Sequence, residues 1–256
     1  MPITESEHKT VAVVTGAGSG IGRAVALKLV EHGYHVYLTG RHQHSLEQTA
    51  SLAEAYSNHV TAFVTDVTQQ ESVDSLFKHI EKKFGRIDLL FNNAGVSLPA
   101  LEVDEVSIND WNRVLSVNLT GVFLCSRAAF ALMKRQKPGG GRIINNGSIS
   151  STTPRPLSAA YTATKHAVTG LTKSLALDGR TYGITCGQID IGNADTAIAK
   201  RIKEGILQSD GSIRAEPTID VECVAEAVLT MAKMPPNANV FQMTVMAAQM
   251  PFVGRG

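Results

Sequence analysis

Cysteine is scarce in this chain, and its three cysteines stand far apart. Cys125, Cys186 and Cys223 are an odd number in 256 residues, and they fit neither a disulfide framework nor the paired spacing of a zinc site. We expect all three to be reduced and mostly buried. Of eight histidines only His42 and His44 are close together, with no cysteine or carboxylate partner at metal spacing. The sequence therefore predicts no metal site.

The chain also lacks an excess of charge and a long apolar run. Its formal net charge is +1, and lysine and arginine form only short groups, which argues against a nucleic-acid partner. No apolar stretch approaches the length of a membrane span, and the first eight residues are polar. We therefore predict no nucleic-acid partner, no membrane association, no secretory signal and a cytoplasmic location.

What is present is an ordinary globular composition with alternating strand and helix patterns. With 43% apolar and 18% charged residues, the chain is long enough for one sizeable α/β domain. No Pro/Gly/Ser linker divides it, so residues 1–256 are predicted to form a single domain. The alternation is typical of βαβ units around a parallel sheet. The expected strands are Thr10–Val14, Tyr34–Thr39, Val60–Thr65, Ile87–Phe91, Arg142–Asn146, Ile184–Ile189 and Val240–Met246.

A glycine-rich turn follows the first expected strand. Gly16, Gly20 and Gly22 fit the pattern G-x-x-x-G-x-G and lead into a helical pattern over residues 23–32. Such glycines let the backbone turn tightly and approach a pyrophosphate, which then binds the free N–H groups of the helix N-terminus. Ile21 occupies the position where the other common dinucleotide fingerprint needs glycine, and no Gly-Lys-Ser/Thr follows, which excludes a Walker loop.

Tyr161 and Lys165 stand four residues apart in a helical pattern, so their side chains share one face of the helix. A free phenol ionises near pH 10, and a tyrosine that exchanges protons near neutrality needs a cation beside it. A unit charge about 4 Å away contributes roughly 4 kcal/mol at an effective dielectric of about 20, which is enough. Ser148 follows an apolar strand, and strand ends are where open α/β sheets bind ligands. These three residues predict a proton-transfer site.

Polar residues also end two other expected strands. Asp66 and Asn92 each follow an apolar run; both residue types are favoured helix caps, so a cap and a cofactor contact are equally supported for each residue alone. Asn118 lies inside the long amphipathic pattern Asn109–Met133. Asparagine costs helix propensity there, which indicates a specific reason for its presence.

Together these motifs resemble the short-chain dehydrogenase/reductase family, in its single-domain branch, over nearly the whole chain. In the family's order the motifs are Thr15-Gly-Ala-Gly-Ser-Gly-Ile-Gly22, Asp66-Val67, Asn92-Asn93-Ala94-Gly95, Asn118, Ser148, and Tyr161 with Lys165. The resemblance implies an α/β fold with a Rossmann-type, doubly wound, seven-stranded parallel sheet and helices on both faces. It also implies an NAD(P)-dependent oxidoreductase that transfers hydride between a nicotinamide cofactor and a small-molecule carbonyl or secondary alcohol.

The resemblance assigns a role to each catalytic position. Tyr161 would be the general acid in reduction and the phenolate base in oxidation. Ser148 would hydrogen-bond the substrate oxygen, Lys165 would favour the phenolate and hold the nicotinamide ribose, and Asn118 would complete a proton relay through water. The implied cofactor-binding residues are Gly16, Ser19, Gly20, Ile21, Gly22, Gly40, Arg41, Asp66, Val67, Asn92, Ala94, Gly95, Tyr161, Lys165, Ile191 and Thr196. The alternative is a catalytically silent cofactor-binding protein that serves as a redox sensor or scaffold.

The end of the second strand predicts which nicotinamide cofactor is used. An NAD enzyme usually carries a carboxylate there, which binds the ribose 2′-hydroxyl and repels a 2′-phosphate. Here that position is Gly40, and Arg41 follows with a guanidinium that can pair with a 2′-phosphate. We predict NADP(H), with NAD(H) as the alternative, because Arg41 could instead stack on the adenine and Ser19 stands where many NADP-preferring relatives carry a basic residue.

The substrate side departs from the family pattern. Ile191 replaces the usual proline, while Gly192 and Thr196 remain; we expect Thr196 and nearby backbone to hold the nicotinamide amide. A substrate lid is expected around residues 190–215, with an ordinary surface helix and loop as the alternative. Arg155 faces the expected substrate region and would either bind an anionic group or point to solvent.

Two long helices are expected to form a subunit interface. Similar proteins assemble through the helices that correspond to Asn109–Met133 and Ala159–Asp178. The resemblance therefore implies a homodimer or homotetramer.

Overall fold

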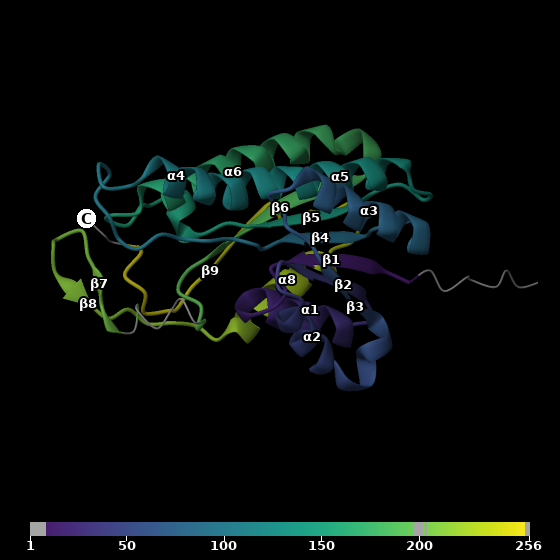
Figure 1. The fold of residues 1–256 in the computed structure, drawn as a ribbon, viewed down its shortest axis with the longest axis horizontal. Helices are drawn as coiled ribbons and strands as arrows, with labels where there is room; N and C mark the ends of the chain where they lie inside the picture. The colour runs from purple at the N-terminus through teal and green to yellow at the C-terminus, as the bar shows by residue number, and fades with distance from the viewer. Residues whose placement is uncertain (1–8, 197–201, 203, 254–256) are drawn as a thin grey trace, which may run out of the picture.

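Seven parallel strands form the centre of the protein (Figure 1). A computed structural model describes residues 9–196, 202 and 204–253. The strand order is β3-β2-β1-β4-β5-β6-β9, and every neighbouring pair is parallel. The strands are β1 (Val11–Thr15), β2 (His35–Gly40), β3 (Val60–Val64), β4 (Leu89–Asn92), β5 (Gly141–Asn146), β6 (Ile184–Ile191) and β9 (Gln242–Val245). The predicted doubly wound sheet is confirmed, and all seven strands occur where the sequence predicted them, with ends shifted by one or two residues.

The helices cover both faces of this sheet. In Figure 1, α3, α4, α5 and α6 lie on one face, and α1, α2 and α8 lie on the other. The helices are α1 (Gly20–Glu31), α2 (Gln43–Ser51), α3 (Gln70–Phe84), α4 (Ile108–Leu115), α5 (Gly121–Arg135), α6 (Ala159–Asp178) and α8 (Val221–Ala232). Short helical segments are η1 (Glu54–His59), η2 (Ser116–Thr120, a π-helix), η3 (Ile149–Ser151) and η4 (Arg180–Tyr182).

The alternation of side chains along a strand explains why the fold has a core on each face. In β1, Ala12 and Val14 pack into the core that contains α1 and α8, whereas Val11 and Val13 pack into the core that contains α3 and α5. Successive residues of a strand point to opposite faces, so a strand covered on both sides is apolar throughout. This is why the predicted strands appear as continuous apolar runs.

The strand order reverses between β1 and β4. From β1 the chain winds outward to β2 and β3, and it then crosses to β4 on the other side of β1. In open α/β sheets, ligands bind at the carboxyl ends of the strands beside such a reversal. The topology therefore directs attention to the residues that follow β1 and β4.

The sequence did not predict a π-helical segment within one long helix, nor a small hairpin. The expected helix Asn109–Met133 is interrupted by η2, which contains Asn118. Strands β7 (Ile206–Leu207) and β8 (Ile213–Arg214) pair antiparallel within the expected lid, but two-residue strands leave no sequence pattern. Residues 197–201 and 203 of that lid lie outside the described residues.

The helical run Ile108–Arg135 is apolar enough to qualify as a membrane span. Its most apolar 18-residue window has a mean hydropathy of 1.5, so the expectation that no apolar stretch approaches that length does not hold. In the fold, Leu124 and Leu132 of this run pack into the core on one face of the sheet, which explains its apolar character.

The cysteines behave as expected in two of three cases. Cys125 and Cys186 are buried, and Cys223 is exposed. Burial raises the pKa of the Cys125 thiol to about 12, so this group is inert near neutral pH. No cluster of three metal-ligating side chains occurs in the described part of the chain.

Candidate active site

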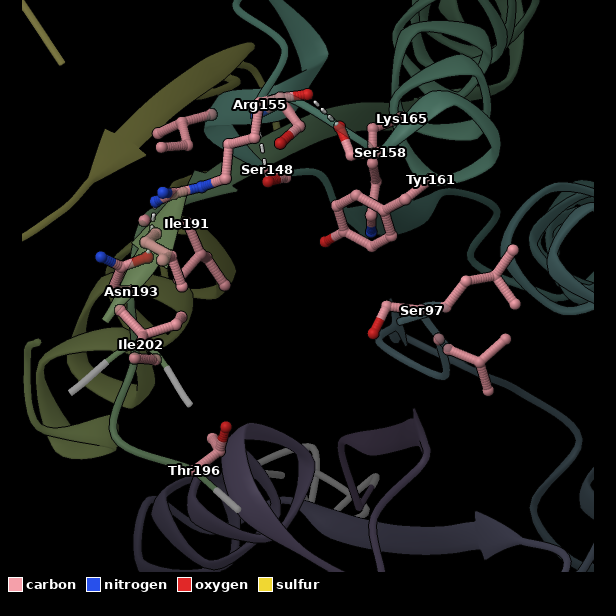
Figure 2. Close-up of a pocket in the computed structure, with 18 of the residues that line it drawn as sticks. Ser97, Ser148, Arg155, Ser158, Tyr161, Lys165, Ile191, Asn193, Thr196 and Ile202 are labelled. Atoms are coloured by element: carbon pink, nitrogen blue, oxygen red, sulfur yellow. Dashed lines mark hydrogen bonds between the residues drawn. The ribbon is translucent and has the colours of Figure 1, made fainter. Parts of the chain in front are cut away.

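A cavity of about 750 Å³ opens at the carboxyl ends of the strands, beside the reversal between β1 and β4. The glycine turn lines one side of it, the start of α6 and η3 line the back, and the end of β6 and the hairpin region line the other side. Figure 2 shows Tyr161, Lys165 and Ser148 at one end of this cavity and Thr196 at the other. Residues from distant parts of the chain thus meet in one space.

The glycine turn leaves room for a ligand against the start of α1. Gly16 and Gly20 have positive φ angles of 66° and 50°, which favour glycine. Ser19 does not cap α1 with its own side chain, and Ser19, Gly20 and Ile21 all line the cavity. The first N–H groups of a helix have no partners within the helix, so this end of the cavity is suited to an anionic group such as a pyrophosphate.

Two side chains that the sequence did not single out support this turn. Arg23 Nε donates to Thr49 Oγ1 at 3.0 Å, and Thr49 Oγ1 donates to the carbonyl of Ala17 at 2.9 Å. Glycine is required at position 22, because a Cβ there would collide with the carbonyl oxygen of Gly16. Gly22 is therefore needed for packing and does not itself line the cavity.

Tyr161 and Lys165 lie one turn apart on α6, as predicted. Lys165 is only 6% exposed, its Nζ lies 5.5 Å from the centroid of the Tyr161 ring, and it donates to the carbonyl of Asn146 at 2.7 Å. Both side chains line the cavity, and the Tyr161 hydroxyl points into it (Figure 2). The buried ammonium group is thus held beside the phenol by the end of β5.

Ser148 follows β5 and faces the same space (Figure 2). Its Oγ accepts a hydrogen bond from the backbone N–H of Ser150 at 3.1 Å. Because a hydroxyl has one hydrogen to donate and two lone pairs, this bond leaves the Ser148 O–H available to an oxygen atom in the cavity.

Asn118 is buried beneath the cavity and does not line it. Its Oδ1 accepts from the N–H of Val96 at 2.8 Å, and its Nδ2 donates to the carbonyl of Val96 at 2.8 Å and to Thr164 Oγ1 at 3.3 Å. Both amide hydrogens are therefore used to fix the loop after β4 against α6. The π-helical geometry of η2 is frequent at functional sites.

The motif after β4 is divided between the core and the cavity. Ala94 and Gly95 line the cavity, as does Asn93, which donates to the carbonyl of Thr15 at 2.9 Å. Asn92 is 2% exposed, and its amide donates to Ser126 and Asn145 in the core. The structure therefore places Asn93, which follows β4, at the cavity. The predicted Asn92 is the last residue of β4 and lies in the core.

Four further predicted residues lie outside the cavity. Gly40 ends β2, Arg41 is exposed next to it, and Asp66 and Val67 follow the neighbouring strand β3. The Asp66 carboxylate accepts from the N–H and the hydroxyl of Thr68 at 2.9 and 2.8 Å, and the N-cap of α3 is Gln69, so Asp66 is not the cap of that helix. These residues form the rim of the sheet beyond the glycine turn, where Ala17 N–H donates to the carbonyl of Thr39.

The opposite wall of the cavity depends on a buried ion pair that the sequence did not indicate. Arg155 Nη1 and Nη2 bind Glu216 Oε1 and Oε2 at 3.0 and 2.6 Å, and Arg155 also donates to Asn193 Oδ1 at 3.0 Å. Glu216 is 3% exposed and accepts from Asn193 and Gln208 as well. Burial alone would raise the pKa of Glu216, but the hydrogen bonds from Arg155 and Asn193 outweigh it and hold that pKa at about 2.

This ion pair resolves the two expectations for Arg155. The guanidinium runs along the cavity wall towards Asn193 (Figure 2), and its fork is occupied by Glu216. Arg155 is thus neither a solvent-facing residue nor an open anion site. Ile191 and Thr196 also line the cavity, and Thr196 lies beside Gly20, where an added Cβ would meet its Cγ2 at 3.1 Å.

Comparison with known proteins agrees with this architecture. A sequence profile for the family described as short chain dehydrogenase matches residues 10–206. A 3beta-hydroxysteroid dehydrogenase of Mediterraneibacter gnavus is 35% identical over 220 residues, which cover 86% of this chain and 79% of the relative. An uncharacterized oxidoreductase of Staphylococcus aureus (strain N315) is 35% identical over 92% of this chain and 96% of its own length.

Solved structures show the same fold. The 3-ketoacyl-(acyl-carrier-protein) reductase from Brucella melitensis, complexed with NADH, matches with a TM-score of 0.83 and 26% identity over 95% of this chain and 99% of that one. The protein ElxO with NADP bound matches with a TM-score of 0.82 and 28% identity over 93% of this chain and 97% of that one. The chain therefore belongs to the short chain dehydrogenase family and is an oxidoreductase of that family.

Proposed function

We propose that this protein transfers hydride between a nicotinamide dinucleotide and a carbonyl or secondary alcohol substrate. The observation that carries the proposal is that Tyr161, Lys165 and Ser148 line the same cavity as the glycine turn at the start of α1. Ligand-bound relatives support a nicotinamide cofactor, since one is complexed with NADH and another has NADP bound.

The residues present fit such a cofactor. Gly16 and Gly20 line the cavity, and a Cβ at these positions would meet Ala94 at 3.0 Å and Thr196 at 3.1 Å respectively. The first turn of α1 offers N–H groups to a pyrophosphate. Lys165 Nζ has one hydrogen bond, to Asn146, and an ammonium group has three donors, so it has donors left for a ribose. When bound here, the nicotinamide supplies or accepts the hydride.

Tyr161 is proposed to be the general acid or base that transfers the proton. In reduction its hydroxyl donates a proton to the substrate oxygen, and in oxidation the phenolate removes one. A positioned acid or base contributes about 10²–10⁴-fold to the rate. Ser148 donates its free O–H to the same oxygen, and the ammonium of Lys165 places a positive charge beside the phenol. Both amide hydrogens of Asn118 are used, so we propose that it takes part in a proton relay to Lys165 through an acceptor oxygen.

The substrate half of the cavity supports an apolar carbonyl compound. Its described lining includes Val96, Leu98, Val106, Ile149, Leu157, Ile202, Ile206 and Leu207. The similarity to a 3beta-hydroxysteroid dehydrogenase makes keto- and hydroxysteroids the first compounds to assay. Residues 190–215 are proposed to act as the lid over this half.

For the cofactor we propose NADP(H), with NAD(H) as the alternative. Gly40 ends β2 without a carboxylate, and the exposed Arg41 has no hydrogen-bond or ion-pair partner among the described residues. Its guanidinium is free to bind a 2′-phosphate, which is worth about 1.5–3 kcal/mol for a charge-assisted hydrogen bond.

We also propose a homodimer or homotetramer in the cytoplasm. Helices α5 and α6 carry exposed apolar side chains, Phe123 at 47% and Leu177 at 59% exposed, which a partner subunit would cover. Sedimentation at micromolar concentration should therefore give a dimer or tetramer, and a stable monomer would contradict it. Fractionation of cells that express the protein tests the location.

The central experiment combines cofactor binding and turnover. We expect purified protein to change the fluorescence of NADPH on binding and to oxidise it when a suitable ketone is supplied. Tyr161→Phe should abolish oxidation and leave the dissociation constant of NADPH within about threefold, because it removes one hydroxyl. Tyr182→Phe is the matched control, since Tyr182 is exposed on η4. Binding without oxidation of any carbonyl by the unmodified protein would instead favour the silent sensor or scaffold.

A further inference from the structure

A buried carboxylate lies directly under Ser148. Asp190, near the end of β6, is 2% exposed, and its side chain accepts four hydrogen bonds. Oδ1 accepts from Ser148 N–H at 2.9 Å, from Ser151 Oγ at 2.8 Å and from Gln188 Nε2 at 2.8 Å. Oδ2 accepts from Gln242 Nε2 at 2.7 Å. All four partners donate, which suits a carboxylate because it has acceptors only.

One oxygen of Asp190 therefore holds both ends of η3. Ser148 precedes this short 3-10 segment and Ser151 ends it. A strand end followed by a single helical turn has few hydrogen bonds of its own, so the direction of the Ser148 side chain depends on what holds the turn. Here the Asp190 carboxylate on the adjacent strand β6 holds the turn. It accepts two charge-assisted hydrogen bonds, which are stronger than hydrogen bonds between neutral groups.

The same carboxylate is connected to the helix that carries Tyr161 and Lys165. Gln188, two residues earlier on the same face of β6, donates to Thr169 Oγ1 at 2.9 Å and accepts from Thr172 Oγ1 at 3.2 Å. Thr169 in turn donates to the carbonyl of Lys165 at 3.3 Å. A continuous set of hydrogen bonds thus joins the Ser148 turn to α6 one turn beyond Lys165.

The neighbouring backbone is shaped to admit this carboxylate. A Cβ at Gly147 would collide with Asp190 Oδ1 and would lie 2.8 Å from Gln188 Nε2. Glycine at position 147 therefore lets the two strand ends approach closely enough for Asp190 to reach the Ser148 N–H. Asp190 itself does not line the cavity, so it acts only through other groups.

We propose that Asp190, with Gln188 as its link to α6, is a positioning residue that fixes the Ser148 hydroxyl relative to the Tyr161 hydroxyl. The inference rests on the proposed role of Ser148 as the donor to the substrate oxygen. Two donors must meet one oxygen atom, and an error of about 1 Å in such an arrangement costs up to about 10²-fold in rate.

The first test is Asp190→Asn, which keeps the shape and places an NH₂ group against at least one donor. We expect kcat to fall 10- to 100-fold while the dissociation constant of NADPH stays within twofold, since no group of Asp190 faces the cavity. Asp88→Asn is the matched control, because Asp88 is a partly buried carboxylate that accepts from the backbone of Val11 at 2.7 Å on another strand. It should lower thermal stability and leave kcat within twofold.

A double-mutant cycle separates positioning from general stability. In a Ser148→Ala background, Asp190→Asn should lower kcat by less than twofold further, because the hydroxyl it positions is gone. An unchanged kcat in folded Asp190→Asn, or an equal loss in both backgrounds, overturns the proposal. Should Asp190→Asn fail to fold, Ser151→Ala replaces it, with an expected three- to tenfold loss that again vanishes in the Ser148→Ala background.

The two proposals fail in different ways. If Ser148→Ala keeps the kcat of the unmodified protein, Ser148 has no catalytic role and the positioning role of Asp190 is overturned with it. If Ser148→Ala lowers kcat and neither Asp190→Asn nor Ser151→Ala does, the role of Asp190 alone is wrong.

Discussion

The two sides of the cavity are built by different means. The glycine side, formed by residues 16–21 and 93–95, follows two adjacent strands and is held mainly by backbone geometry and by short contacts such as Asn93 to Thr15. The lid side, so called after the lid proposed around residues 190–215, includes residues 155–157, 202 and 205–207 with the end of β6. It depends on Glu216, which lies 61 residues after its partner Arg155. The first arrangement requires glycines at fixed positions, and the second requires side chains that only the fold brings together.

This difference explains how each side would tolerate change. On the glycine side a Cβ at position 22 would collide with the carbonyl oxygen of Gly16, and one at position 16 would lie 3.0 Å from the Cα of Ala94. On the lid side four polar side chains form one hydrogen-bonded cluster, and each can be altered separately. They are Arg155, Asn193, Gln208 and Glu216. The proposed catalytic residues lie on α6 and after β5, between the two sides. Variants of the glycine side should therefore affect cofactor binding, and variants of the lid side should affect substrate binding.

The largest effect is expected for Lys165→Ala, because Lys165 is proposed to act in both cofactor binding and proton transfer. Loss of the buried ammonium removes the charge beside Tyr161 and a donor to the ribose, so kcat should fall at least 100-fold and cofactor affinity about tenfold. Steady-state kinetics measures kcat, and fluorescence titration with NADPH measures the cofactor affinity. Lys173→Ala, an exposed lysine on the same helix, should change neither. A loss of kcat with unchanged affinity would remove the ribose role.

Gly40→Asp tests the glycine side alone. A Cβ at Gly40 meets only Leu46, at 3.4 Å, so the side chain can be accommodated. The carboxylate should repel a 2′-phosphate and bind a 2′-hydroxyl, so the ratio of kcat/KM for NADPH over NADH should fall about ten- to hundredfold. Gly40→Asn is the neutral control and should keep most of the NADPH preference. An NADH preference in the unmodified enzyme would show that the assignment of Arg41 is wrong.

Glu216→Gln tests the lid side alone. The change keeps the shape but removes the charge that binds Arg155, so we expect the KM of the carbonyl substrate to rise about three- to tenfold while NADPH affinity stays within twofold. Glu226→Gln, which alters an exposed ion pair with Lys28, is the control and should change neither. An equal effect on substrate and cofactor would mean that the two sides are not independent.

Glu216 should make the free energy of unfolding depend on pH in the acid range. Its pKa is about 2 in the folded protein against 4.5 as the ordinary value, so its contribution is complete above about pH 4.5 and is lost as the pH falls towards 2. The two values differ by about 2.5 units, which corresponds to at most roughly 3 kcal/mol. Chemical denaturation between pH 5 and 3 should show a weaker decline for Glu216→Gln than for the unmodified protein.

The smallest effect on activity is expected for His35, which is remote from both sides. Burial, with smaller contributions from Lys83 and Lys9, lowers the pKa of His35 to about 4. Protonation is therefore favoured in the unfolded chain, and the free energy of unfolding should fall as the pH drops from about 6.5 to 4. His35→Gln should flatten that part of the curve and leave kcat within twofold. An unchanged pH dependence would contradict the assignment.

Much of this protein could be predicted from its sequence because the relevant signals are local. The seven strands follow from apolar runs bounded by turns, and the positions of Gly16, Gly20, Tyr161, Lys165 and Ser148 at one sheet edge follow from motifs of a few residues. Such patterns depend on backbone conformation and helical spacing, which are properties of neighbouring residues.

Other features depend on which side of a strand a residue faces or on contacts across long distances in the chain. The adjacent asparagines at the end of β4 look alike in sequence, yet Asn93 lines the cavity and Asn92 lies in the core. The pairing of Arg155 with Glu216 and of Asp190 with Ser148 has no local signature, since the partners are 61 and 42 residues apart. Local sequence determined the strands, the glycine turn and the catalytic spacing. The tertiary structure alone decided which buried charges meet, because the desolvation of a charge is offset only by the partners that folding brings within hydrogen-bond distance.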